Sequence, residues 1–153
     1  MRKIFVFLAA SVLLFTSCNL MGSDAPQVPQ DSAIAVQLLD VQTFKPLNVI
    51  AKYNGPDVAS LKKDSTQKYS LEALLYYDEH EVEHILAKYF DADIPKGNYS
   101  KKEFEFNWLD DDIMKEMGTG DPKYTGSPDL FLGTNGKAKL WFVGRKILVK
   151  LDN

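Results

Sequence analysis

The chain has 153 residues, of which 45% are hydrophobic and 25% are charged, and its formal net charge is −3. This balance is typical of one globular domain and excludes a chain that is disordered throughout. The mildly acidic charge gives no electrostatic attraction for DNA or RNA, which bind clustered lysines and arginines, so we expect no nucleic-acid partner.

The start of the chain has the order of an export signal. Arg2 and Lys3 precede an apolar run over residues 4–15, and two small residues then lead to Cys18, the only cysteine. The apolar run is too short to stay as a stable membrane span. Because a single cysteine excludes an intramolecular disulfide, the position of Cys18 needs another explanation.

The segment 14–18, LFTSC, resembles the lipobox of bacterial lipoproteins through Thr16, Ser17 and Cys18. The resemblance implies that residues 1–17 are a cleaved signal peptide. It also implies that the thiol of Cys18 receives a diacylglycerol and that the new amino group is usually acylated. Two or more acyl chains hold a protein stably on a membrane, so the membrane is the first expected partner.

Asn19 follows the predicted lipid-bearing cysteine. In the enterobacterial sorting rule, an aspartate at this position favours retention in the inner membrane, and asparagine is not that signal. The resemblance therefore implies a lipid-anchored protein of the cell envelope, on the outer membrane rather than the inner one. Residues 18–32 contain prolines, a glycine and polar side chains, so we interpret them as the acylated cysteine and a flexible tether. Residues 33–153 are expected to form a single globular domain.

The domain begins with two predicted strands. Residues 33–41 and 47–53 are short and rich in β-branched side chains, and a turn near residues 45–46 joins them. A short helical turn is predicted over residues 57–63.

Residues 70–90 fit two structures. Ser70 is a suitable N-cap, and the apolar residues of the segment fall on one stripe of an amphipathic helix. Residues 69–77 also alternate between apolar and polar, as a strand would. We favour one helix and keep a pair of strands as the alternative.

Residues 101–108, KKEFEFNW, alternate strictly, with Phe104, Phe106 and Trp108 on one face. This pattern predicts a strand. Residues 130–132 and 138–143 are predicted to form a hairpin around Asn135-Gly136, since that pair supplies the positive φ angles of a type I′ turn. A last strand is predicted over residues 146–151.

These elements predict an α+β fold, with a mostly antiparallel sheet of about six strands and one main helix against it. The alternative is an all-β sandwich in which residues 69–90 form two strands.

Residues 80–84, HEVEH, match H-E-x-x-H and include the only two histidines. The pattern resembles the zincin metallopeptidases, in which two histidines one helical turn apart hold zinc and the glutamate activates a water. The resemblance implies His80 and His84 as ligands and Glu81 as the general base.

Several features argue against a catalytic zinc site. Glu83 places a charge inside the motif, and Ala87 and Phe90 occupy positions where the longer metzincin pattern has glycine and histidine. A third ligand would have to be a carboxylate, and nothing singles one out. We therefore expect no catalytic residue and no cofactor, and we place incidental surface binding of metal ahead of a catalytic centre.

Charged residues are unevenly distributed. Residues 78–112 carry eleven acids and four lysines, whereas residues 137–150 carry five basic residues and no acid. We expect the basic residues to pair with acids of the same chain or to line a solvated hairpin edge. We favour this interpretation over a polarised surface that binds a charged partner. The acids at residues 110–112 are expected to begin a helix rather than bind calcium, because they lack EF-hand spacing.

The sequence thus favours a non-catalytic binding or structural module of the cell envelope, whose partner besides the membrane is another envelope protein or a ligand. The alternative function is a small zinc-dependent hydrolase that uses His80, Glu81 and His84.

Overall fold

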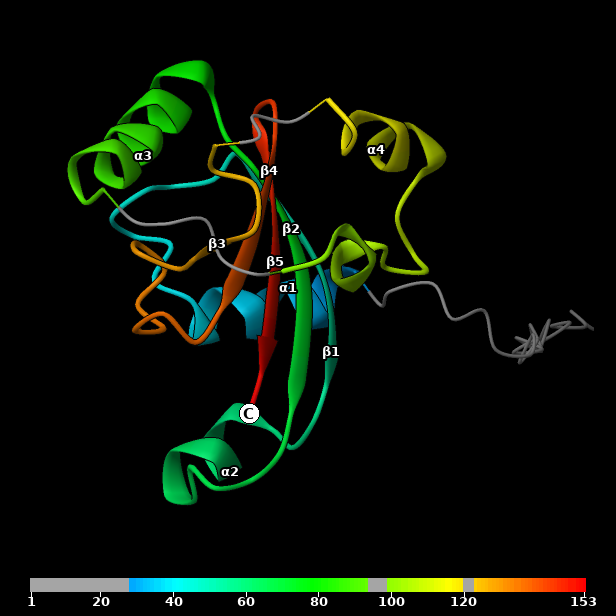
Figure 1. Ribbon diagram of the computed structural model, residues 1–153. Helices are drawn as coiled ribbons and strands as arrows, with labels where there is room; N and C mark the ends of the chain where they lie inside the picture. The colour runs from blue at the N-terminus through cyan, green and yellow to red at the C-terminus, as the bar shows by residue number, and fades with distance from the viewer. Residues whose placement is uncertain (1–27, 94–98, 120–122) are drawn as a thin grey trace, which may run out of the picture.

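The computed structural model describes residues 28–93, 99–119 and 123–153. Its centre is a five-stranded antiparallel sheet in the order β1-β2-β5-β4-β3 (Figure 1). Helices α3 and α4 lie on opposite sides of this sheet. The predicted α+β fold with a mostly antiparallel sheet is confirmed, and the all-β alternative is wrong.

The elements match several predicted segments. The strands are β1 (Asn48–Asn54), β2 (Ser70–Tyr76), β3 (Ser127–Pro128), β4 (Lys139–Val143) and β5 (Lys146–Asp152), and the helices are α1 (Val28–Leu38), α2 (Val58–Lys63), α3 (Glu79–Asp91), the 3₁₀ turn η1 (Lys101–Phe104) and α4 (Asp111–Glu116). The strands predicted over 47–53, 138–143 and 146–151 and the turn over 57–63 are confirmed. No helix in the described ranges has the length and hydropathy needed to cross a bilayer.

The larger core lies on the sheet face that α1, α3 and the loop of residues 129–138 cover. The helices contribute Ala35, Val82, Ile85 and Tyr89, and Leu39 follows directly after α1; all are buried against apolar sheet residues. The aromatic rings of Tyr89 and Phe142 meet edge to face, with centroids 5.3 Å apart. This face therefore fixes α3 by its apolar side and leaves the other side of the helix free for solvent.

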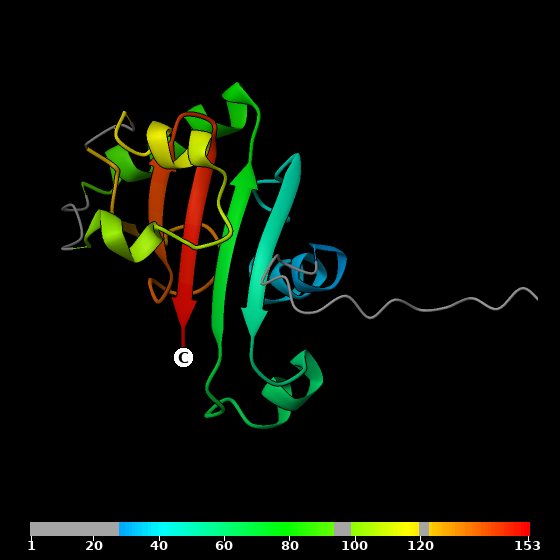
Figure 2. The ribbon, with the colours of Figure 1, turned by 90° about the vertical axis from the view of Figure 1, so that its right-hand side faces the viewer.

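The smaller core lies on the second face, under η1 and α4. Figure 2 looks onto this layer, with η1 and α4 on the side of β4 and β5, while no helix lies in front of β1. The core joins Leu74, Trp141, Val143 and Leu148 of the sheet to buried residues of the covering segment, Phe104, Phe106, Ile113 and Met117. The covering layer is partial, so part of this face stays open.

The strand predicted over residues 33–41 is wrong, because α1 occupies most of that segment. Ala35 and Leu39 stand four residues apart, and in a helix this spacing places both against the sheet. The helix starts at Val28, so it also includes residues assigned to the tether. The Asp31 carboxylate accepts a hydrogen bond of 3.2 Å from the backbone N–H of Tyr53, which ties α1 to β1.

The single helix favoured for residues 70–90 is half wrong. The first part is the strand β2, in which Leu71, Ala73 and Leu75 face the larger core, as the alternation indicated. The helix begins after Asp78, whose side chain accepts a 2.9 Å hydrogen bond from the Glu81 N–H. Asp78 is therefore the N-cap that ends the extended segment and starts α3.

The strand predicted over residues 101–108 is also wrong, because the segment forms η1 and a loop. Ser100 and Glu103 form a capping box that begins the turn. Phe104 and Phe106 are buried while Glu105 is exposed, so the alternation reflects burial without any neighbouring strand. The Phe106 and Trp108 rings stack at 5.7 Å.

Residues 130–132 form no strand, because β4 pairs with β3 instead. The buried carboxylate of Asp129 organises this segment, accepting four hydrogen bonds from Phe131, Leu132 and Thr134. The positive φ angles expected at Asn135 and Gly136 are present, at 53° and 78°.

Candidate functional site

Cys18, the predicted lipid-bearing residue, and the predicted signal peptide lie outside the described residues.

Helix α3 brings His80 and His84 together. Their ring centroids are 4.1 Å apart, with an angle of 60° between the ring planes. Both side chains are exposed, while Val82 and Ile85 on the same helix are buried. The histidines therefore lie on the solvent side of α3.

The described ranges contain no group of three or more histidine, cysteine or acidic side chains that could surround a metal ion. Catalytic zinc sites usually combine three protein ligands with an open position. Glu81, which follows His80 in the chain, is half-buried. The HEVEH segment thus supplies a ligand pair and a carboxylate, without the third ligand that the zincin arrangement requires.

The acids at residues 110–112 lie at the start of α4, which agrees with their expected place at a helix N-terminus. Asp110 is the N-cap residue, and Asp112 pairs with Lys115 at 3.4 Å on the exposed surface. Within the described part of the chain they belong to no metal-binding group.

A different candidate site is a groove of about 380 Å³ on the second face of the sheet, beside the segment that follows η1. Its walls combine side chains of β1, β2 and β5 with side chains of residues 102–107. The lining residues are Lys52, Asn54, Ser70, Glu72, Lys102, Glu103, Glu105, Phe106, Asn107 and Lys150. Nearly all of these are polar, so the groove suits a charged or hydrogen-bonding group rather than an apolar one.

A row of charged residues crosses the sheet at the groove, in which Lys52, Glu72 and Lys150 line the groove and Lys139 lies beyond its lining. Lys52 stands opposite Glu72, Glu72 opposite Lys150, and Lys150 opposite Lys139. Directly opposed residues on antiparallel strands lie close enough for their side chains to interact. The row therefore concentrates three lysines around one glutamate.

Glu72 is held by a neutral partner rather than by the flanking lysines. Its carboxylate accepts a 2.8 Å hydrogen bond from the Trp108 indole N–H. Within the described residues it has no ion pair with Lys52 or Lys150. Lys52 makes only a long contact of 3.5 Å with the side-chain oxygen of Asn107.

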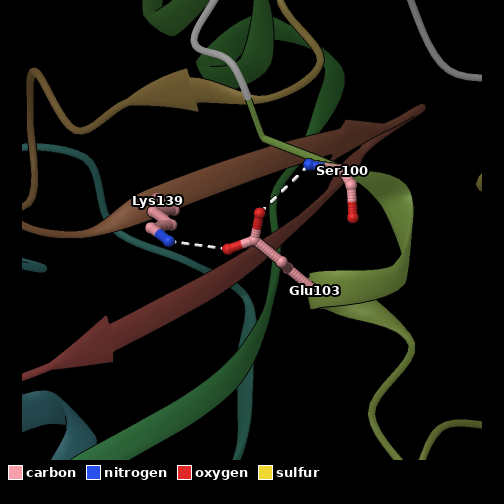
Figure 3. Close-up of polar contacts among 3 residues, drawn as sticks. All are labelled: Ser100, Glu103 and Lys139. Atoms are coloured by element: carbon pink, nitrogen blue, oxygen red, sulfur yellow. Dashed lines mark hydrogen bonds and ion pairs between the residues drawn. The ribbon is translucent and has the colours of Figure 1, made fainter.

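Glu103 closes the end of the groove nearest β4. Figure 3 shows its carboxylate between two donors, the Lys139 ammonium at 2.6 Å and the Ser100 backbone N–H at 3.1 Å. The Lys139 hydrogen bond is the main cause that lowers the pKa of Glu103, and the same bond raises the pKa of Lys139. The Lys139 ammonium also lies 5.1 Å from the centre of the Tyr99 ring. Lys139 is therefore neutralised within the protein.

The remaining cations of the groove are available to a ligand. Within the described ranges, Lys102 and Lys150 have neither a hydrogen-bond partner nor an ion-pair partner for their ammonium groups. Glu105 is the corresponding acid without a partner there, and it is exposed. The lining contains three lysines and three glutamates, and because Lys139 from outside the lining neutralises Glu103, the three lysines face only two unneutralised acids, Glu72 and Glu105. The arrangement favours an anion, and it contains no nucleophile with an adjacent base.

Sequence reasoning missed this groove because its residues come from segments far apart in the chain. One signal was present, namely the basic residues in 137–150. The expected internal pairing is confirmed for two of them, since Lys139 pairs with Glu103 and Lys146 pairs with Glu116 at 2.5 Å. Lys150 instead lines the groove.

Comparisons with known proteins found no protein family, no curated protein and no solved structure that matches this chain.

Proposed function

We propose that the protein is a lipid-anchored module of the bacterial cell envelope that binds a ligand without catalysing a reaction. The lipobox-like segment ending in Cys18 supports the anchor and outer-membrane placement. The binding role rests on one observation, the groove in which the ammonium groups of Lys102 and Lys150 have no hydrogen-bond or ion-pair partner among the described residues, while the Lys150 charge also acts on Glu103 and helps to lower its pKa.

The ligand of the groove is a molecule that carries carboxylate groups, either a small metabolite or part of another envelope protein. Carboxylates form charge-assisted hydrogen bonds with ammonium groups, and Lys150 and Lys102 supply such donors. Asn54 and Ser70 add neutral donors and acceptors that can orient the ligand. Lys52, Glu72 and Lys150 lie on strands of the sheet, and rigid elements keep the geometry of this side of the groove fixed.

A short oligoglutamate peptide tests this proposal. We expect it to bind and to change the fluorescence of Trp108, whose indole already contacts Glu72 at the groove. An oligolysine peptide of equal length should not bind. Lys150→Gln should weaken oligoglutamate binding by up to about fivefold, the range of one exposed ion pair.

Lys137→Gln is the matched control, because Lys137 is exposed and lies outside the groove lining. It should leave oligoglutamate binding unchanged. Equal losses in the two variants would show a general charge effect and would remove the groove from the proposal.

The anchor is tested separately by mass spectrometry of protein extracted from membranes. We expect Cys18 as the first residue, carrying a diacylglycerol mass. An unmodified Cys18 or an intact Met1 would contradict the lipoprotein proposal while leaving the groove experiment valid.

The zinc hydrolase alternative gains no support from the site. The described residues provide two imidazoles and no third ligand group around them. Binding therefore remains the better-supported function.

A further inference from the structure

Helix α3 presents a pair of side chains that neither the core nor the groove uses. His80 and His84 are the only histidines of the chain, and the helix places them one turn apart. Their ring centroids are 4.1 Å apart and both rings are exposed. Neither ring supports the fold, so their juxtaposition calls for a role at the surface.

We propose that His80 and His84 form a binding site for one divalent transition-metal ion, with water in the remaining coordination positions. Imidazole nitrogens bind such ions at about 2.0–2.1 Å, so two nitrogens that share an ion lie about 3 Å apart. Rings with centroids 4.1 Å apart reach this spacing through small side-chain rotations. By the general order of affinities for nitrogen ligands, Cu²⁺ binds more tightly than Zn²⁺.

The surrounding charges favour a cation. Asp78, Glu79, Glu81 and Glu83 lie within or beside the pair, and residues 78–87 contain no lysine or arginine. The N-terminal end of a helix carries partial positive charge that opposes a cation. The acidic side chains offset this charge, although Asp78 also serves as the N-cap of the helix.

The helix is held rigidly beneath the pair. Val82, Ile85 and Tyr89 are buried in the larger core, and the Tyr89 hydroxyl donates a 2.7 Å hydrogen bond to the Pro128 carbonyl. Ligands on a fixed element need little ordering when the metal binds. With no third ligand group in the described residues, the site binds an ion without the geometry of a hydrolytic centre.

The test titrates the full chain, purified without a histidine tag and freed of metal by a chelator, with CuCl₂, ZnCl₂ and MgCl₂. We expect one Cu²⁺ per chain, weaker Zn²⁺ binding, and no Mg²⁺ binding, because Mg²⁺ prefers oxygen ligands. The electron paramagnetic resonance spectrum of the bound Cu²⁺ should show imidazole nitrogen coupling. His84→Gln should lower the Cu²⁺ affinity at least tenfold, as the loss of even an outer-shell partner costs about 10- to 100-fold.

Two matched variants separate this site from other metal-binding groups. Glu105→Gln, which removes an exposed carboxylate outside α3, and Cys18→Ser should keep the Cu²⁺ affinity of the wild type, and His84→Gln should keep the oligoglutamate binding of the wild type. An unchanged Cu²⁺ affinity in His84→Gln, or its loss in Cys18→Ser, would overturn the proposed site. Either result would leave the proposed binding groove unaffected.

Discussion

At the scale of single residues, Asp129 shows how one buried carboxylate can organise an irregular segment. Its side chain is 3% exposed and accepts hydrogen bonds of 2.6–2.9 Å from three backbone amides and one hydroxyl. The loop that follows places Phe131 and Leu132 in the larger core. Asp129 therefore supports both the hydrogen bonding of this loop and the packing of its apolar side chains in the core.

We predict that Asp129→Ala destabilises the protein by about 3 kcal/mol or more, because several buried donors lose a charged acceptor. Urea unfolding monitored by circular dichroism measures this loss. Asp40→Ala is the control, since the Asp40 carboxylate accepts hydrogen bonds from Gln42 and Thr43 on the exposed surface. Similar losses for the two variants would contradict the role given to burial.

The pair of Glu103 and Lys139 predicts a dependence of stability on pH. The hydrogen bond from Lys139 lowers the pKa of Glu103 below its ordinary value of 4.5 in the folded state. A lowered carboxyl pKa stabilises the fold fully above the unfolded value, and this stabilisation disappears as the pH falls through the folded value.

Glu103→Gln should therefore lower the melting temperature at about pH 7, and the difference should shrink as the pH falls below 4.5 to about pH 3. Glu105→Gln provides the control, because Glu105 is exposed and has no partner among the described residues. Its melting curve should follow that of the wild type at both pH values. A Glu103→Gln difference that is the same at both values would refute the assigned cause.

At the scale of elements, the connection between β4 and β5 depends on a glycine. Gly144 has a φ of 55°, in the left-handed region, and an added Cβ would meet no atom within 4 Å. Gly144→Ala should therefore destabilise the protein by about 1 kcal/mol through backbone strain alone.

Thermal unfolding of Gly144→Ala beside Gly118→Ala tests this prediction. Gly118 has no positive φ, and its nearest contact for a Cβ is an ordinary one of 3.5 Å. Its replacement should be neutral or slightly stabilising. A Gly144→Ala variant as stable as the wild type would show that the turn adapts to a side chain.

The elements also show what the sequence could and could not predict. Strands β4 and β5 were predictable because a two-residue turn separates two strongly apolar segments. Residues 33–41 were misassigned because β-branched side chains suggest a strand, whereas packing of Ala35 and Leu39 on the sheet favours a helix. Local preference is weak when tertiary burial opposes it.

Residues 101–108 show the opposite limit. Their alternation is real, since Phe104 and Phe106 are buried and Glu105 is exposed. A strand also needs a neighbour for its backbone hydrogen bonds, and the capping box at Ser100 begins a turn instead. The alternation of residues 101–108 therefore predicted correctly which side chains are buried, but it predicted wrongly that their backbone forms the hydrogen bonds of a strand.

At the scale of the whole molecule, the first helix α1 belongs to the folded domain, although the sequence assigned its first residues to a tether. Ala35 is fully buried and Leu39 is 3% exposed, so the first helix belongs to the core. We predict that the full chain and a chain without residues 1–27 both unfold cooperatively in urea. A chain without residues 1–40 should lose cooperative unfolding, because each buried side chain of leucine size contributes about 1.5–3 kcal/mol. Cooperative unfolding of the shorter chain would show that α1 is dispensable.

The histidine pair of α3 could be predicted from the sequence, whereas the groove could not. His80 and His84 are neighbours on one helix, so spacing alone brought them together. The groove joins β1, β2, β5 and residues 102–107, and only the strand order makes Lys52, Glu72 and Lys150 neighbours. Strand order is a long-range property that local patterns do not contain.

Both borders of the sheet are protected against pairing with another chain. At β1, the Asp31 carboxylate occupies the N–H of Tyr53 and the Asn48 side chain occupies the N–H of Val49. At the other border, β3 is only two residues long. Unpaired strand edges act as templates for fibrils and other ordered aggregates. A second copy of the chain would therefore meet two β1 amides that are already hydrogen-bonded and, at the other border, a strand of only two residues, and both features disfavour growth of a cross-β assembly.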